Sequence, residues 1–442
     1  MRSLDKDRVP DPSRSLVAEF WWRAHVELKP DPARTVLKPF HLAYPGQSDG
    51  EAVRTRAIID RMLSLDSRTR EIARTYLTNL LDDRHRNIEG ALLRRFDALR
   101  AYLPPKKRFQ KRDKLLIGGL FDEEYAFEAA ALFNPSIVRH WNQRGLKKGE
   151  VRFILSLRGI GEGHVSSVTF RTGVWNGKRR VRVDKPSPYA SPPIVDEIGK
   201  DDTALCLRFE DAEDLSEAVL FPMTDSQARG LEDLRLVTLT EDDGSSRYVG
   251  LFTAFDGRDA RQQILTTTDF NCFEMRPLDG RAVRNKGMAL FPRRIDGRYA
   301  MISRQDNESI WLMTSDDLYR WDKAEKIIEP LHPWEMVQMG NCGSPIEIDE
   351  GWLLITHAVG IVRNYTIGAC LLDKNDPSKV LARSNIPLLR SGPEQRDGYV
   401  PNVVYSCGAL VEGRRILLPY GVADNFTTIV TGDLDAMLEH MS

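Results

Sequence analysis

Five short apolar stretches, each about the length of one β-strand, recur along the chain and constrain its fold more than any other feature. The second, third and fourth begin about 50 residues apart, which is the length of one β-propeller blade. A different pattern, at residues 266–273 and again at 314–321, repeats at nearly the same spacing. Because a four-stranded sheet buries both faces only when neighbouring sheets stack on it, the repetition predicts an all-β five-bladed β-propeller. The five stretches are residues 153–158, 248–253, 299–304, 352–357 and 416–420.

The chain from about residue 50 to residue 103 has a different periodicity, typical of α-helices. Apolar side chains recur there every three or four residues, and Pro104 and Pro105 end the pattern. The sequence therefore predicts an N-terminal extension over residues 1–120, mainly helical from about residue 50, and a propeller catalytic domain over residues 121–442. Since the apolar stripes need a partner, they allow a homo-oligomer. The stripes are Ile58, Met62 and Leu65; Ile72, Tyr76 and Leu80; and Ile88, Leu92, Phe96, Leu99 and Leu103.

The charge balance argues against nucleic acid and membranes as partners. The chain has 63 Lys and Arg residues against 64 Asp and Glu residues, a formal net charge of −1. No overall field draws such a chain to a polyanion or to an anionic membrane. The N-terminus lacks the apolar core of a signal peptide, and no run of about 18 apolar residues follows. We therefore expect a cytoplasmic protein.

The cysteines and histidines point away from a metal centre. The 5 cysteines are odd in number, contain no CxxC pair and lie mostly in strand-like stretches. We expect them to be buried free thiols. The 8 histidines show no spacing suited to metal ligands. We expect neither a metal nor a cofactor.

The densest polar group lies in residues 230–236, where Glu232, Asp233 and Arg235 precede an apolar strand. This group alone is a weak signal, but further motifs follow it in a fixed order. Together with Asn134 and its neighbours at residues 133–135, they resemble glycoside hydrolase family 130, the inverting mannoside phosphorylases and hydrolases built on a five-bladed propeller. The resemblance runs from about residue 133 to the C-terminus and leaves out the helical front end. The further motifs are residues 285–292, 340–345, 351–357, 373–379, 400–405 and 421–424.

The resemblance implies that Asp233 is the general acid that protonates the glycosidic oxygen. It falls on the aspartate of the family's Glu-Asp-Pro-Arg motif, and Arg235 falls on the arginine, which would hold the sugar. Leu234 replaces the usual proline. A general acid must stay protonated until the substrate arrives, and we expect the carboxylate of Glu232 to raise the pKa of Asp233.

Hydrolysis would require a second carboxylate that activates water on the opposite face of the sugar. Glu162 is the candidate, in a Gly-Glu-Gly-His loop at residues 161–164 where His164 could orient water or sugar hydroxyls. This loop resembles the β-1,2-mannosidase branch of the family. The leading prediction is an inverting glycosidase that cleaves β-linked mannosides, most simply β-1,2-linked oligosaccharides, with Asp233 as general acid and Glu162 as general base.

Phosphorolysis would instead require cations that hold phosphate, which is then the nucleophile. Arg158, Lys286, Arg304 and His357 are candidates on separate strand-like segments, suited to an oxyanion. The residues beside them depart from the phosphorylase pattern, since Gly287 stands where the family has aspartate. The alternative prediction is a β-mannoside phosphorylase that releases α-mannose 1-phosphate, with inorganic phosphate as co-substrate. A third hypothesis is a non-catalytic propeller that binds sugar, because a fold by itself does not determine a function.

The resemblance also implies residues that grip the sugar. Asn134, Asn285, Tyr405 and Asp424 fall in matching motifs and supply amide, phenol and carboxylate groups suited to sugar hydroxyls. We therefore expect a mannose-containing oligosaccharide as the binding partner.

Overall fold

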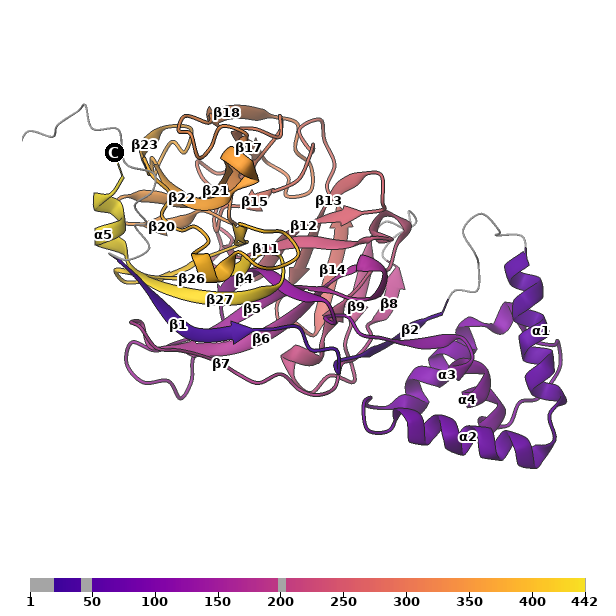
Figure 1. Ribbon diagram of the computed structural model, residues 1–442. Helices are drawn as coiled ribbons and strands as arrows, with labels where there is room; N and C mark the ends of the chain where they lie inside the picture. Colours follow the sequence, from indigo (N-terminus) through magenta and orange to yellow (C-terminus); the bar gives the residue numbers. More distant parts are fainter. Residues whose placement is uncertain (1–19, 41–49, 198–203, 442) are drawn as a thin grey trace, which may run out of the picture.

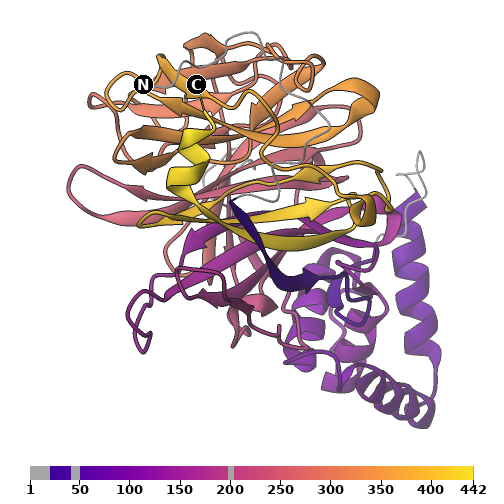
Figure 2. The same cartoon turned by 60° about the vertical axis from the view of Figure 1, so that its left-hand side comes forward.

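The structure is a computed structural model that describes residues 20–40, 50–197 and 204–441. It is mostly β-structure with few helices. The sheets form one body, and four N-terminal helices lie together at one side of it (Figures 1 and 2). Within the described ranges, no helix combines the length and the apolar character needed to cross a membrane.

Antiparallel pairing groups most strands into five units. The first unit contains β4 (Ala131–Arg139), β5 (Val151–Ile160), β6 (Ser166–Trp175) and β7 (Val181–Val183), with β10 (Val219–Leu220) beside β6. The second contains β11 (Gly230–Thr240), β12 (Ser246–Phe255), β13 (Ala260–Thr267) and β14 (Cys272–Pro277), extended by β9 (Leu205–Arg208) and β8 (Ile194–Glu197). A parallel bridge between Gly230 and Ser166 joins these two units into one sheet.

The other three units are separate sheets. The third contains β15 (Ala289–Leu290), β16 (Tyr299–Ser303), β17 (Ile310–Ser315) and β18 (Ala324–Ile328). The fourth contains β19 (Gln338–Asn341), β21 (Gly351–Val359), β22 (Tyr365–Leu372) and β23 (Val380–Arg383), with β20 (Ile346–Ile348) beside β21. The fifth contains β24 (Val404–Tyr405), β26 (Arg415–Val422), β27 (Phe426–Asp433) and β1 (Trp21–Leu28), with β25 (Leu410–Glu412) beside β26.

Each of the five repeated stretches lies in the second strand of one unit, namely β5, β12, β16, β21 or β26. These strands are central in their sheets, which explains why most of their residues are apolar. The structure also explains the repeat at residues 266–273 and 314–321. The backbone N–H groups of Asp269 and Asp317 donate to Thr267 Oγ1 and Ser315 Oγ, so both copies form the same turn.

The N-terminal and C-terminal strands meet in the fifth unit. β1 pairs with β27, and the indole nitrogen of Trp21 donates to the carbonyl of Leu388 at 3.0 Å. β4 of the first unit contacts β26 and β27, and Leu132 N–H donates to Asn425 O at 2.9 Å. The boundary at residue 120 stays a prediction, although β1, which precedes it, pairs with β27 in the fifth unit.

Four helices follow β2 (Val36–Pro39), which pairs with β3 (Asp122–Tyr125) between the helices and the sheets. They are α1 (Glu51–Ser64), α2 (Ser67–Leu81), α3 (Ile88–Ala98) and α4 (Lys111–Gly119); a short α5 (Leu434–Glu439) lies near the C-terminus. Leu92 and Phe96 of the α3 stripe are buried as expected. The α2 stripe is exposed instead, with Ile72 at 63% and Tyr76 at 69%.

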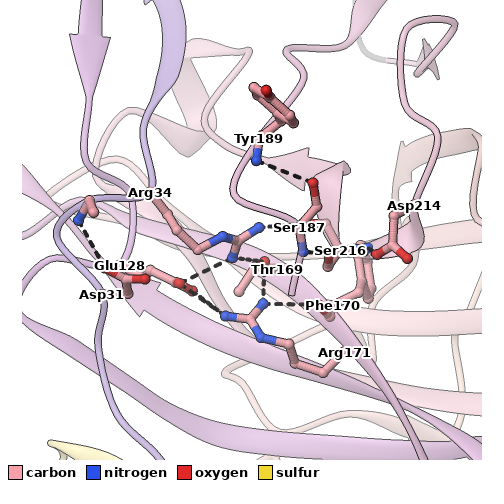
Figure 3. A network of polar contacts seen from close by, with 11 residues as sticks. Asp31, Arg34, Glu128, Thr169, Phe170, Arg171, Ser187, Tyr189, Asp214 and Ser216 are labelled. Atoms are coloured by element: carbon pink, nitrogen blue, oxygen red, sulfur yellow. Dashed lines mark hydrogen bonds and ion pairs between the residues drawn. The ribbon is translucent and has the colours of Figure 1, made fainter. Parts of the chain in front are cut away.

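A buried charge cluster anchors the segment between β1 and β2 to the first unit (Figure 3). Glu128, which is fully buried, lies 3.1 Å from Arg34 and 2.8 Å from Arg171. Arg34 also donates to the backbone carbonyl of Ser216. On the helical side, Arg86 pairs with the buried Glu217 at 3.0 Å. The helices are therefore tied to the sheets by charge as well as by the β2–β3 pair.

All five cysteines are free thiols. Cys342, Cys370 and Cys407 are buried as expected, but Cys206 and Cys272 are not. The expectation of burial is wrong for these two because β9 and β14 lie at the outer side of the second unit, where the inserted β8–β9 hairpin begins.

Candidate active site

Two interruptions in strand pairing bring Asn134 and Asp233 together. The pairing of β4 with β5 shifts around Asn134, and that of β11 with β12 shifts around Asp233. Their φ angles are 47° and 52°, in the left-handed region that non-glycine residues rarely adopt. Asn134 Nδ2 donates to Asp233 Oδ1 at 2.7 Å. Such bulges redirect side chains beside functional sites. Here two bulges place the amide of Asn134 against the carboxylate of Asp233.

Arg158 binds both carboxylates of the predicted acidic pair. Its two terminal nitrogens lie 3.2 Å from Asp233 and 2.9 Å from Glu232, and its Nε donates to Ser166 Oγ at 2.8 Å. Lys286 Nζ lies 3.4 Å from Glu232. All three nitrogens of Arg158 thus contact protein groups, so the structure does not leave it free to hold phosphate.

The charge state of Asp233 differs from the expectation. Burial by itself raises the pKa of Asp233, but Arg158, Arg235 and Lys286 outweigh burial and lower the pKa from 3.8 to about 2. The expectation that Glu232 raises this pKa is wrong, because Arg158 and Lys286 compensate the charge of Glu232. Asp233 is therefore ionised at neutral pH in the free protein and must gain a proton before it acts as an acid.

A recess of ≈ 30 Å³ lies beside Asp233 and shares part of its lining with an outer cavity of ≈ 300 Å³. Both spaces are lined by Asp233, Lys286, Arg304, His357 and Tyr405. Arg235, Gly287, Gly340 and Asn341 complete the recess. The outer cavity is also lined by Asn134, Arg158, Asn307, Gln338, Arg363, Tyr365, Val400, Val403 and Asp424.

The recess contains two buried arginines that lack a carboxylate partner. Arg235 is 2% exposed and donates to Tyr405 Oη at 2.6 Å and to the backbone oxygen of Asp233 at 3.3 Å. Arg304 is 7% exposed, and Nε of each arginine has no hydrogen-bond partner. In the part of the chain that the structure describes, neither guanidinium has a carboxylate within ion-pair distance. Because buried charge is costly unless it is paired, this geometry suits an anionic ligand.

His357 is a neutral member of the recess. Its Nδ1 lies 3.2 Å from the carbonyl oxygen of Asn341, which only accepts hydrogen bonds, so Nδ1 carries the proton. Nε2 then accepts from Arg304 at 3.3 Å. Burial, with Arg304 and Arg235 nearby, lowers the pKa of His357 well below 6.5. The prediction that His357 supplies a positive charge is therefore wrong.

Asp424 is the second carboxylate in the outer cavity. It lies in the turn between β26 and β27 with φ 49°. Burial and the neighbouring charge of Asp233 raise its pKa from 3.8 to about 6, against the opposing effect of Arg158 and Arg363. Asp424 is thus the more easily protonated carboxylate of the two.

The other predicted site residues lie apart from the cavity lining. Glu162 and His164 are exposed in the short turn η4 (Glu162–His164), and neither lines the recess or the outer cavity. The amide of Asn285 donates to the backbone oxygens of Arg304 at 3.3 Å and Gln305 at 2.6 Å, so it shapes the loop that carries Arg304. The role of Glu162 as a base stays a prediction that this geometry does not support.

Arg363 was missed by sequence reasoning, although the repeats contained a signal. It ends the turn η7 (Ile361–Arg363) between β21 and β22, as His164 ends η4 between β5 and β6. Gly360 and Gly161 begin the two turns with similar angles, φ −116° and −107°. Both turns also end in residues of positive φ. Aligning the hairpins after the repeated strands would have identified Arg363.

Comparison with known proteins identifies the family. The profile of a glycoside hydrolase family 130 group, described as beta-1,4-mannooligosaccharide phosphorylase, matches residues 201–442. The chain belongs to glycoside hydrolase family 130.

Two phosphorylases are similar to this chain in sequence, and a third is similar in structure. The chain is 36% identical over 317 residues to a beta-1,2-mannobiose phosphorylase of Thermoanaerobacter sp. strain X514, covering 68% of this chain and 90% of the relative. It is 39% identical over 219 residues to a 1,2-beta-oligomannan phosphorylase of the same strain, covering 48% of this chain and 70% of the relative. The beta-1,2-mannobiose phosphorylase of Listeria innocua shares its fold, with a TM-score of 0.52 at 21% identity over 72% of this chain and 92% of that chain.

Proposed function

We propose that this protein is a β-mannoside phosphorylase that uses inorganic phosphate as its nucleophile. The observation that carries the proposal is the recess, where Arg235 and Arg304 are buried beside Lys286 and have no carboxylate partner among the described residues. Charge-assisted hydrogen bonds from arginine suit phosphate oxygens. The names of the relatives, which are β-mannoside phosphorylases, support the same substrate class.

The arrangement of charges suits an inverting reaction. Phosphate in the recess would attack the anomeric carbon while the bond to the leaving oxygen breaks on the other face of the sugar. Asp233 would give its proton to that oxygen, directly or through a sugar hydroxyl. The products are α-mannose 1-phosphate and an oligosaccharide shortened by one ring. Asn134, Tyr405 and Asp424, around the cavity, would hold sugar hydroxyls.

The same geometry explains why Asp233 is ionised when no substrate is bound. In the free protein its negative charge offsets part of the positive charge of Arg235 and Lys286. Phosphate would take over that role and release Asp233 to bind a proton. The acid is then available only when the nucleophile is present, which suppresses hydrolysis.

We also propose that the five units are the blades of a closed propeller, with residues 121–442 as its catalytic domain. The contact of β4 with β26 and β27 supports a ring in which the first and fifth units meet. β1 would then fasten the ring as the outer strand of the last blade. A closed ring places the inner strands β4, β11 and β24 around the cavity.

Turnover of β-1,2-mannobiose with and without inorganic phosphate tests the proposal. We expect mannose 1-phosphate and mannose with phosphate, and negligible cleavage in phosphate-free buffer. Equal cleavage in both buffers would favour the hydrolase. If no cleavage occurs and sugar binding is unchanged in Asp233→Asn, the protein is a binding scaffold.

A further inference from the structure

His164 and Tyr399 form an exposed aromatic pair, and Tyr399 is next in sequence to Val400 of the outer cavity. Tyr399 is 72% exposed, and its ring centroid lies 5.4 Å from that of His164, with 35° between the ring planes. His164 belongs to the first unit, whereas Tyr399 precedes the first strand of the fifth. Exposed tyrosine in a cluster of this kind is a common feature of binding surfaces.

Tyr399 is connected to the cavity lining through its neighbour in sequence. Val400, the neighbour of Tyr399, lines the outer cavity and donates its N–H to Ala423 O at 3.1 Å, next to Asp424. The turn that ends at His164 has the same form as the turn that ends at Arg363, and Arg363 lines the cavity. A ligand that extends out of the cavity past Val400 would come next to Tyr399.

The turn that carries His164 is held in place before any ligand binds. The Tyr125 hydroxyl donates to Val165 O at 3.0 Å, and Gly161 N–H donates to the same oxygen at 3.1 Å. Gly161 lies so close to Tyr125 that a Cβ there would be 2.4 Å from the hydroxyl oxygen. A platform that is already ordered loses little entropy when it binds.

We propose that His164 and Tyr399 bind the third sugar ring of a β-mannooligosaccharide whose first two rings lie in the cavity. This inference rests on the proposed function and adds a preference for chain length. A cavity of ≈ 300 Å³ is at the lower end of the range for small-ligand sites, which suits two rings and leaves a third at the mouth. The C–H face of a pyranose packs on an aromatic ring, while the tyrosine hydroxyl and the imidazole N–H can bind its hydroxyls.

Kinetics with β-1,2-mannobiose and β-1,2-mannotriose test this inference. Tyr399→Ala should lower kcat/KM for the trisaccharide about two- to tenfold, the range for one aromatic contact, and leave the disaccharide unchanged. Tyr399→Phe should retain most of the preference because the ring remains. His164→Asn, which tolerates the left-handed backbone, should act in the same direction as Tyr399→Ala. Tyr76→Ala, at an exposed tyrosine of α2, is the matched control.

The outcomes separate the inference from the proposed function. Equal effects on both substrates, or no effect on either, would overturn the proposed role of His164 and Tyr399. The proposal that the protein is a phosphorylase would be unaffected. If the wild-type protein cleaves neither sugar, the proposed function fails. The affinity for mannotriose is then measured by calorimetry for the wild type and for Tyr399→Ala. Equal affinities would overturn the proposed role of His164 and Tyr399.

Discussion

Phosphate binding should bring a proton onto Asp233, and calorimetry can count that proton. Burial raises the pKa of Asp233, yet Arg158, Arg235 and Lys286 bring it down to about 2 in the free protein. Each pKa unit corresponds to about 1.36 kcal/mol, so protonating this carboxylate at neutral pH, roughly five units higher, costs about 7 kcal/mol.

A phosphate dianion in the recess opposes that cost. Two negative charges at about 5 Å from the carboxylate, with an effective dielectric constant of about 20, destabilise its ionised form by about 7 kcal/mol. The two energies nearly cancel, so the protonated and ionised forms of Asp233 become similar in free energy at neutral pH. Phosphate binding at neutral pH should then take up roughly half a proton at Asp233.

The assay is a phosphate titration at constant pH and ionic strength in buffers with different ionisation enthalpies. The slope of apparent binding enthalpy against buffer enthalpy gives the number of protons exchanged. The ionisation of phosphate itself contributes to the wild type and to Asp233→Asn alike, so the difference between their slopes isolates Asp233. Equal slopes would refute the coupling, and an absence of phosphate binding to both proteins would refute the anion site.

Three further substitutions probe the site and the fold. Arg304→Met should raise KM for phosphate about tenfold or more, because it removes a charged donor worth roughly 1.5–3 kcal/mol, whereas Arg320→Met on the surface of the same unit should not. Glu128→Ala should lower the free energy of unfolding by about 3–5 kcal/mol in urea denaturation, since it leaves two buried arginines unpaired; exposed Glu394→Ala should cost less than about 1 kcal/mol. Asp424→Asn should raise thermal stability at pH 8 but not at pH 3. Because the pKa of Asp424 is raised from 3.8 to about 6, the folded protein loses stability as pH rises through this range. The loss is up to roughly 3 kcal/mol. An equal effect of the substitution at both pH values would contradict this reasoning.

The repeated strands were predictable because burial in a central strand leaves a local mark. The middle residues of β12 and all of β21 are buried on both faces, so most of their residues are apolar, with Thr253, Thr356 and His357 as exceptions. The helices were predictable where they pack on one another, because burial of one face leaves apolar residues at helical spacing. α4 is not identified from the sequence, because the apolar pattern ends at Pro104 and Pro105, before this helix begins.

The site was only partly predictable. Asp233 and Arg235 were found because the order of the motifs survives in sequence. The pairing of Arg158 with Glu232 and Asp233 was not, because residues 74 or more positions apart meet only through the fold. Glu162 resembled a base because glycines surround it, but local sequence does not say which hairpin residue reaches the cavity.

The most direct test of the account is the source of the oxygen at the anomeric carbon. β-1,2-Mannobiose is digested in water labelled with heavy oxygen, with unlabelled phosphate present, and the products are weighed by mass spectrometry against an enzyme-free control. Attack by phosphate predicts mannose 1-phosphate whose anomeric oxygen is unlabelled. Free mannose that carries the label above the control, with no mannose 1-phosphate, would show that water is the nucleophile and would contradict the account.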